Sequence, residues 1–192
     1  LSAYTAVTYG AFAADVRALG SALTAELEPG DRAAIFAPNR VEWATAALAV
    51  QAVGGVIVPV YPASTPAQLA YVLDHSDARV VFVDTPALLA KVLEAWPSLH
   101  DDGRGLRRVV LLDAGLDAER VLAKVRAEGR AAPSDEALAR VLSLTDLLTA
   151  GAARDAASPG AFEARMGAVS LDQPGMMLYT SGTSGNPKGV PL

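Results

Sequence analysis

The stretch from residue 56 to residue 83, VIVPVYPASTPAQLAYVLDHSDARVVFV, reads as a strand, a helix and a second strand. Residues 56–58 form a short apolar run that is typical of a buried strand. The pair Thr65-Pro66 predicts a helix start, because threonine caps a helix well and proline fits its first position. Apolar residues between 69 and 73 follow at helical spacing, and residues 80–83 form the second apolar run.

The same alternation continues on both sides of this unit, across residues 1–112. Parallel strands need a crossover connection, and a helix supplies it. We therefore expect an α/β fold, a mostly parallel sheet flanked by helices. The further expected elements are a helix that starts at Thr8 and ends before Pro29-Gly30, strands at 33–36 and 109–112, a helix capped by Asn39, and a helix at 86–96.

The remaining chain divides into two parts. Residues 113–170 are rich in alanine and charge, and they predict a helical surface segment with helices around 121–125 and 138–148 and no strand. Residues 171–192 predict a short strand at 176–179 followed by a glycine-rich loop.

Composition excludes several classes of function. The chain is 52% hydrophobic and 19% charged, which predicts a folded globular interior. Its 16 basic and 21 acidic residues are interspersed, so nucleic acid is not an expected partner. With no cysteine and two distant histidines, neither a disulfide framework nor a zinc site is expected, and a reducing cytoplasm fits. The apolar stretch 44–60 contains Gln51 and Pro59, so we expect a buried helix and strand there rather than a membrane span.

Isolated polar residues near the strands and helix ends predict structural roles. His75 falls at the end of a helix, where histidine commonly satisfies terminal carbonyls, and His100 falls in a polar loop. Arg79, Asp84 and Asp113 flank strands, and we expect solvated ends rather than a catalytic pair.

One candidate chemical site stands out, the loop TSGTSGNPKG at 180–189. Glycine lets a backbone approach an anion closely, hydroxyls add donors, and a lysine supplies a mobile positive charge. These residue types together suit a polyphosphate. The candidate phosphate-binding residues are Thr180, Ser181, Gly182, Thr183, Ser184, Gly185 and Lys188.

Two other interpretations of this loop exist. A Ser/Thr/Gly loop after a strand is often only a solvent-exposed turn, although the terminal lysine argues against that. A Walker A loop requires a Gly-Lys-Ser/Thr ending and a helix after it. Pro187 stands where that glycine should be, and Gly189 and Pro191 disfavour a helix. A loop between two strands is therefore expected.

The segment LYTSGTSGNPKG, residues 178–189, resembles the ATP-phosphate signature of adenylate-forming enzymes, a family of acyl-CoA synthetases, luciferases and peptide-synthetase adenylation domains. Other segments also resemble that family and have structural readings as turns, caps and buried strands: PGDR at 29–32, APNR at 37–40 with Glu42-Trp43, and VPVYP at 58–62. The segment FEAR at 162–165 is most similar to bacterial long-chain fatty acyl-CoA ligases.

The resemblance implies a two-step reaction. A fatty acid carboxylate attacks the α-phosphate of ATP with Mg²⁺, pyrophosphate leaves, and coenzyme A takes the acyl group from the adenylate. Lys188 and the loop donors would stabilise the charge that develops on pyrophosphate. The resemblance implies a cytoplasmic ligase, and a lipid substrate would be compatible with peripheral membrane contact.

In this family the adenine-binding aromatic segment, the magnesium-binding glutamate, the ribose-binding aspartate and the catalytic lysine follow further along the chain. We therefore expect residues 1–192 to be a partial N-terminal AMP-binding domain without its C-terminal domain, inactive alone. Two alternatives stay open at this point. One is an adenylate-forming enzyme for an aryl or amino acid, and the other is a non-catalytic interaction module that retains the loop.

Overall fold

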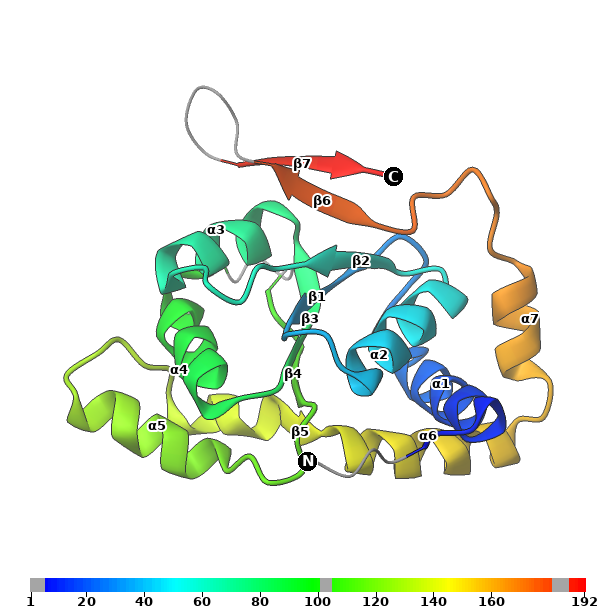
Figure 1. Cartoon of the computed structure of the whole chain (residues 1–192), viewed down its shortest axis with the longest axis horizontal. Helices are drawn as coiled ribbons and strands as arrows, with labels where there is room; N and C mark the ends of the chain where they lie inside the picture. The colour runs from blue at the N-terminus through cyan, green and yellow to red at the C-terminus, as the bar shows by residue number, and fades with distance from the viewer. Residues whose placement is uncertain (1–5, 101–104, 181–186) are drawn as a thin grey trace.

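A five-stranded parallel sheet in the order β2-β1-β3-β4-β5 forms the centre of the computed structural model, which describes residues 6–100, 105–180 and 187–192 (Figure 1). Every pairing within this sheet is parallel, which confirms the expected α/β class. The strands are β1 (Arg32–Phe36), β2 (Val56–Pro59), β3 (Ala78–Val83), β4 (Arg108–Leu111) and β5 (Val141–Ser143).

Helices cover both faces of the sheet, as the crossovers require (Figure 1). Helices α3 (Pro66–His75), α4 (Pro86–Ala95) and α5 (Ala118–Ala127) pack on one face. The other face is covered by α1 (Tyr9–Leu23), α2 (Val41–Ala52) and α6 (Leu144–Ala157). Helix α7 (Ala161–Gly167) also packs on that side. The described residues also include two short 3₁₀ helices, η1 (Trp96–Ser98) and η2 (Asp135–Arg140).

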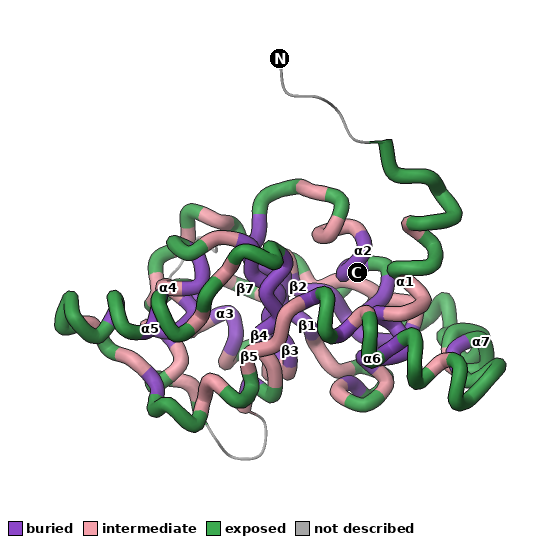
Figure 2. The backbone as a smooth tube through the Cα atoms, turned by 90° about the horizontal axis from the view of Figure 1, so that it is seen from below, coloured by how far each residue is buried: buried purple, intermediate pink, exposed green. Residues whose placement is uncertain are grey.

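Side chains of each strand alternate between two cores. Phe36 lies in the core under α3, α4 and α5, and its neighbour Ile35 lies in the core under α1, α2 and α6. Both side chains are fully buried. Figure 2 shows buried residues concentrated along the strands and exposed residues on the outer helices. Burial on both faces explains why the strands read as continuous apolar runs.

The predicted helix starts are mostly confirmed. The Thr8 hydroxyl accepts a hydrogen bond from the Ala11 amide at 3.1 Å, and Thr65 forms a reciprocal capping box with Gln68. One cap was wrong, because α2 begins after Arg40 instead of Asn39, and Arg40 makes no side-chain capping bond.

The expectation of no strand between 113 and 160 was wrong. The helix predicted at 138–148 is divided into η2, the strand β5 and the start of α6. Strand β5 has three half-buried residues and pairs with β4, with Val141 opposite Val109. Ser143 then caps α6 by accepting from the Asp146 amide at 3.0 Å. Pairing with a distant strand, rather than local sequence, creates this element.

The apolar stretch 44–60 contains most of α2 and all of β2, as expected. No helix in the part of the chain that the structure describes is long and apolar enough to cross a bilayer. A second, two-stranded antiparallel sheet follows α7, formed by β6 (Met177–Thr180) and β7 (Lys188–Pro191). Figure 1 shows this hairpin beside β2, at the edge of the large sheet.

Candidate functional site

The hairpin β6–β7 brings two of the candidate site residues together. In its antiparallel register Thr180 is directly opposite Lys188, and Tyr179 is opposite Gly189. Opposite residues in such a pair have Cβ atoms about 5 Å apart. Thr180 and Lys188 are both exposed, and they form the last pair of the ladder. A hydroxyl and an ammonium group thus flank the two ends of the glycine-rich loop.

The other candidate residues, Ser181, Gly182, Thr183, Ser184 and Gly185, lie outside the described residues. Their part in phosphate binding therefore stays a prediction. The chain after Lys188 is a strand, so the prediction that no helix follows this lysine is confirmed. The loop connects two strands, which differs from the strand-to-helix connection of a Walker A loop.

The base of the hairpin is fixed to the edge of the large sheet. The Gly175 carbonyl accepts a hydrogen bond from the Ile57 amide and another from the Gln51 side chain, each at 3.1 Å. Ile57 and Met176 form an isolated parallel bridge. Since β2 is the edge strand, the hairpin covers backbone groups that would otherwise remain open.

His75 does not have the role expected from sequence. Its Nδ1 atom lies 2.8 Å from the Tyr179 hydroxyl, in a contact between α3 and β6. Burial raises the pKa of the Tyr179 hydroxyl. Tyr71, one helical turn before His75, was not singled out in the sequence, because nothing local indicates that its hydroxyl would reach the Pro187 carbonyl, just before β7. His100 does lie in a polar environment, with Nδ1 at 2.8 Å from Asp74.

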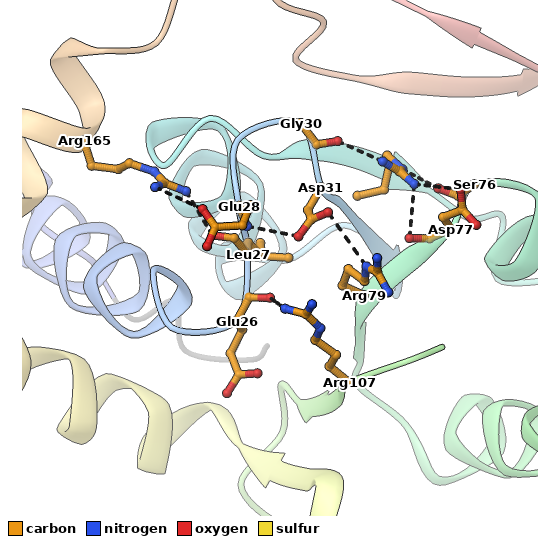
Figure 3. Close-up of polar contacts among 11 residues, drawn as sticks. Glu26, Leu27, Glu28, Gly30, Asp31, Ser76, Asp77, Arg79, Arg107 and Arg165 are labelled. Atoms are coloured by element: carbon orange, nitrogen blue, oxygen red, sulfur yellow. Dashed lines mark hydrogen bonds and ion pairs between the residues drawn. The ribbon is translucent and has the colours of Figure 1, made fainter. Parts of the chain in front are cut away.

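The segment 29–32 acts as a structural junction (Figure 3). The Arg32 guanidinium donates to the Ser76 carbonyl and, at 3.0 Å, to the Gly30 carbonyl. The Asp31 carboxylate accepts from the Glu28 amide at 3.0 Å and lies 3.8 Å from Arg79 Nε. These contacts join the α1–β1 loop to the α3–β3 turn, in agreement with the structural role expected for this segment.

Arg165 of the segment 162–165 also has a structural role. Its Nε donates to the Val53 carbonyl at 2.9 Å, and its Nη2 donates to the Leu27 carbonyl at 3.0 Å. Figure 3 shows its guanidinium pointing from α7 toward the loop that contains Leu27 and Glu28. The guanidinium thereby ties α7 to the loop after α1 and to Val53 at the end of α2, where a helix leaves carbonyls open.

The carboxyl ends of β1 and β3 carry a second charged cluster. The order β2-β1-β3-β4-β5 reverses between β1 and β3, and ligands of open α/β sheets commonly bind at such a switch point. Arg40 follows β1, and its Nε donates to Glu42 at 2.6 Å. Asp84 follows β3, and its Oδ2 lies 3.6 Å from Arg40 Nη1.

The expectation that Asp84 is a solvated strand end was wrong, whereas Asp113 is exposed as expected. Asp84 is 5% exposed, and its Oδ1 has no hydrogen-bond partner. Burial raises the pKa of the Asp84 carboxyl, and Arg40 partly opposes that shift. Local sequence gave no signal of this burial, because the charged partner of Asp84, Arg40, lies 44 positions earlier in the chain. Arg79, also expected to be solvated, is half-buried.

No three His, Cys, Asp or Glu side chains within residues 6–100, 105–180 and 187–192 come together in a way that could hold a metal ion. Among the described residues the hairpin thus offers a hydroxyl at Thr180 and an ammonium group at Lys188, and no cluster of metal-ligating side chains lies beside them.

Comparison with known proteins gives a consistent result. A family model described as AMP-binding enzyme matches residues 1–192. A sulfoacetate–CoA ligase of Cupriavidus necator is 34% identical over 188 residues, which are 97% of this chain and 29% of that protein. The long-chain-fatty-acid–CoA ligase FadD15 of Mycobacterium bovis is 32% identical over 190 residues, which are 98% of this chain and 26% of that protein.

Among solved structures, a benzoate CoA ligase from Burkholderia xenovorans LB400 superposes with a TM-score of 0.65 and 25% identity. The match covers 96% of this chain and 29% of that structure. The chain thus spans between a quarter and a third of the length of these proteins.

Proposed function

We propose, from the premise that this chain belongs to the AMP-binding enzyme family, that the protein carrying it activates a carboxylic acid with ATP. The acid would attack the α-phosphate, pyrophosphate would leave, and coenzyme A would then take the acyl group. The observation that carries this proposal is the pairing of Thr180 with Lys188 at the end of the β6–β7 ladder. Both CoA ligase relatives and the family match support it.

The chemical role of the loop is electrostatic. As the bond between the α- and β-phosphates breaks, negative charge grows on the leaving pyrophosphate. The Lys188 ammonium, with the hydroxyls and amides of Thr180, Ser181, Thr183 and Ser184, would stabilise that charge. Gly182 and Gly185 would let the backbone approach the phosphates closely. Lys188 is exposed, so its side chain is accessible to a nucleotide.

Mg²⁺ is expected to enter with the nucleotide. The described residues do not form a carboxylate cluster for it, so the ion would be held by the ATP phosphates and by residues outside the described part. The contribution of this chain to the first step is therefore the binding and orientation of phosphate groups.

The preferred acid that we propose is a long-chain fatty acid. The resemblance at 162–165 and the identity to FadD15 support this choice. Another acid is the second candidate, because a sulfoacetate–CoA ligase has comparable identity and a benzoate CoA ligase has the same fold. For the fatty acid, a cytoplasmic enzyme with peripheral contact to a membrane would be suitable.

We further propose that residues 1–192 are the N-terminal part of the AMP-binding domain. Residues 1–112 would supply the α/β scaffold, 113–170 the outer segment and 171–192 the phosphate loop. Since the chain spans 29% and 26% of its two CoA ligase relatives, the rest of the catalytic machinery would lie elsewhere in the intact protein. Purified alone, the 192 residues should form no acyl-adenylate.

The experiment that tests the function is ATP–pyrophosphate exchange by the intact protein with a panel of fatty, aryl and sulfonated acids. Long-chain fatty acids should support the fastest exchange. Lys188→Ala should slow exchange about a hundredfold, which corresponds to roughly 3 kcal/mol of lost transition-state stabilisation. The rate of thioester formation from a supplied acyl-adenylate should stay largely unchanged, because no pyrophosphate leaves in that step.

Lys124→Ala is the matched control, since Lys124 is 74% exposed and its nearest carboxylate, Glu128, is 3.9 Å away. It should exchange at the parent rate. Equal exchange by Lys188→Ala and Lys124→Ala would refute the role of Lys188, and no exchange with any acid would refute the function.

A further inference from the structure

Helix α3 contacts the residue just before β7 through one hydroxyl group. The Tyr71 hydroxyl donates a hydrogen bond to the Pro187 carbonyl at 3.0 Å. Pro187 immediately precedes Lys188, and both Tyr71 and Pro187 are half-buried. The peptide group that leads into the candidate phosphate-binding lysine is therefore attached to the scaffold.

The same helix holds the opposite strand of the hairpin. His75 Nδ1 lies 2.8 Å from the hydroxyl of Tyr179, which immediately precedes Thr180. Each attachment is thus one residue away from the Thr180–Lys188 pair that ends the ladder. Because Tyr71 and His75 are four residues apart, they lie on the same face of α3.

Three rings pack together at this point, and we call Tyr71, His75 and Tyr179 the ring cluster. Tyr71 and His75 stack, with centroids 5.3 Å apart and planes at 26°. Tyr179 meets both rings edge-on, at 6.5 Å and 85° from Tyr71 and at 5.7 Å and 80° from His75. Stacked and edge-to-face arrangements are the favourable ones for such rings. The cluster therefore has defined geometry as well as two hydrogen bonds.

Gly189 makes room for this arrangement. It is opposite Tyr179 in the ladder, and a Cβ atom built on it would lie 3.2 Å from Tyr179 Cζ and 3.0 Å from Met177 Sδ. The Tyr179 ring therefore leans across β7 at a position where a side chain would push it away. The glycine that follows Lys188 in the sequence consequently lets Tyr179 pack within the β6–β7 ladder, which we call the stem of the loop.

We propose that Tyr71 and His75 are positioning residues for Lys188, and that the ring cluster sets both ends of the phosphate loop before the nucleotide binds. The proposal rests on the proposed function of the loop. A flexible stem would have to lose conformational freedom in the transition state, whereas a stem held by α3 has lost it during folding. A group that acts on developing charge needs such support from neighbouring residues.

The first test is hydrogen exchange on the intact protein, which requires no activity. Tyr71→Phe keeps the ring and removes the hydroxyl, and His75→Phe keeps the stacking and removes the hydrogen bond. Each substitution should speed the exchange of β6 and β7 amides by roughly three- to tenfold, the loss expected for one hydrogen bond. Amides of β1 and β3 should keep their rates.

The second test is ATP–pyrophosphate exchange by the intact protein carrying the same substitutions. Tyr71→Phe should lower kcat roughly three- to tenfold and leave the KM for the acid unchanged, because the cluster acts on the phosphate end of the reaction. Tyr9→Phe is the matched control, since Tyr9 is 93% exposed and removal of its hydroxyl should change neither measurement.

The outcomes separate the two proposals. Unchanged β6–β7 exchange in Tyr71→Phe and His75→Phe would overturn the ring cluster as an anchor. Faster amide exchange with an unchanged kcat, or a KM for the acid that rises as kcat falls, would overturn the positioning role. An unsubstituted intact protein that shows no pyrophosphate exchange would refute the proposed function instead. Hydrogen exchange alone would then test whether the ring cluster attaches the β6–β7 hairpin to α3.

Discussion

Asp84 is the one charged side chain that is buried among the described residues, at 5% exposure. It follows β3 at the carboxyl edge of the sheet, with Arg40 at 3.6 Å and one oxygen without a hydrogen-bond partner. A carboxylate in such surroundings loses hydration that one distant guanidinium only partly replaces. The residue thus costs stability when it is ionised.

This burial predicts a pH dependence of stability. Because the pKa of Asp84 lies above its ordinary value of 3.8, the native state binds the proton more tightly than the unfolded chain does. The stabilising contribution is therefore present at low pH and is lost as the pH rises from 3.8 through the raised native pKa. Asp84→Asn should increase the free energy of unfolding at pH 7 by about 1 kcal/mol, with the gain vanishing near pH 3.

Urea unfolding at both pH values measures the effect. Asp15→Asn is the control, because Asp15 is exposed and its replacement should change the free energy of unfolding by less than about 0.5 kcal/mol. A lower stability of Asp84→Asn at pH 7 would show that the contact with Arg40 outweighs desolvation.

At the residue scale, the sequence predicts what kind of ligand a segment could bind better than it predicts which side chains touch one another. The hydroxyl, glycine and lysine pattern at 180–189 indicates a phosphate loop, since those types in that order suit an anion. The contact between Tyr71 and Tyr179 could not be predicted, because the two residues are 108 positions apart in the chain. The burial of Asp84 escaped prediction for the same reason.

Helices α1 and α6 pack unusually closely at Gly151. A Cβ atom on Gly151 would lie 1.8 Å from the Ala18 carbonyl oxygen and 3.0 Å from the Ala22 amide nitrogen. Both neighbours are backbone atoms of α1, which cannot rotate away as a side chain can. The absence of a side chain at this position lets the two helices approach and cover one face of the sheet.

Gly151→Ala is expected to lower the free energy of unfolding by about 3 kcal/mol, because α6 would have to move away from α1. Gly167→Ala is the matched control, since Gly167 ends α7 and a Cβ atom there meets nothing within 4 Å. Alanine at that position should be neutral or stabilising by up to about 1 kcal/mol. Thermal or urea unfolding measures both, and equal stabilities of the two variants would contradict the close approach.

Elements with a strong local pattern were predicted, and elements that depend on distant pairing were not. Helix α3 has its cap, its proline and its apolar spacing within residues 65–73, so its start was predicted to the residue. Strand β5 has three residues and exists because β4 offers an open edge. A window of local sequence contains no information about that edge.

For the whole molecule, alternation of strands and helices predicted the α/β class and the parallel sheet, because crossovers leave few other solutions. The order β2-β1-β3-β4-β5 could not be predicted, since alternation alone does not say on which side each strand adds. The attachment of the β6–β7 hairpin beside β2 likewise depends on Gly175 contacts that no local pattern indicates.

Hydrogen exchange in the intact protein tests most directly whether the hairpin that ends in Thr180 and Lys188 holds the phosphates of ATP. With saturating Mg²⁺ and ATP, backbone amides of residues 180–189 are predicted to exchange at least about tenfold more slowly than without nucleotide, because bound phosphates would occupy them. Adenosine, which lacks phosphates, should give no such protection. Identical exchange across 180–189 with and without ATP would contradict the account.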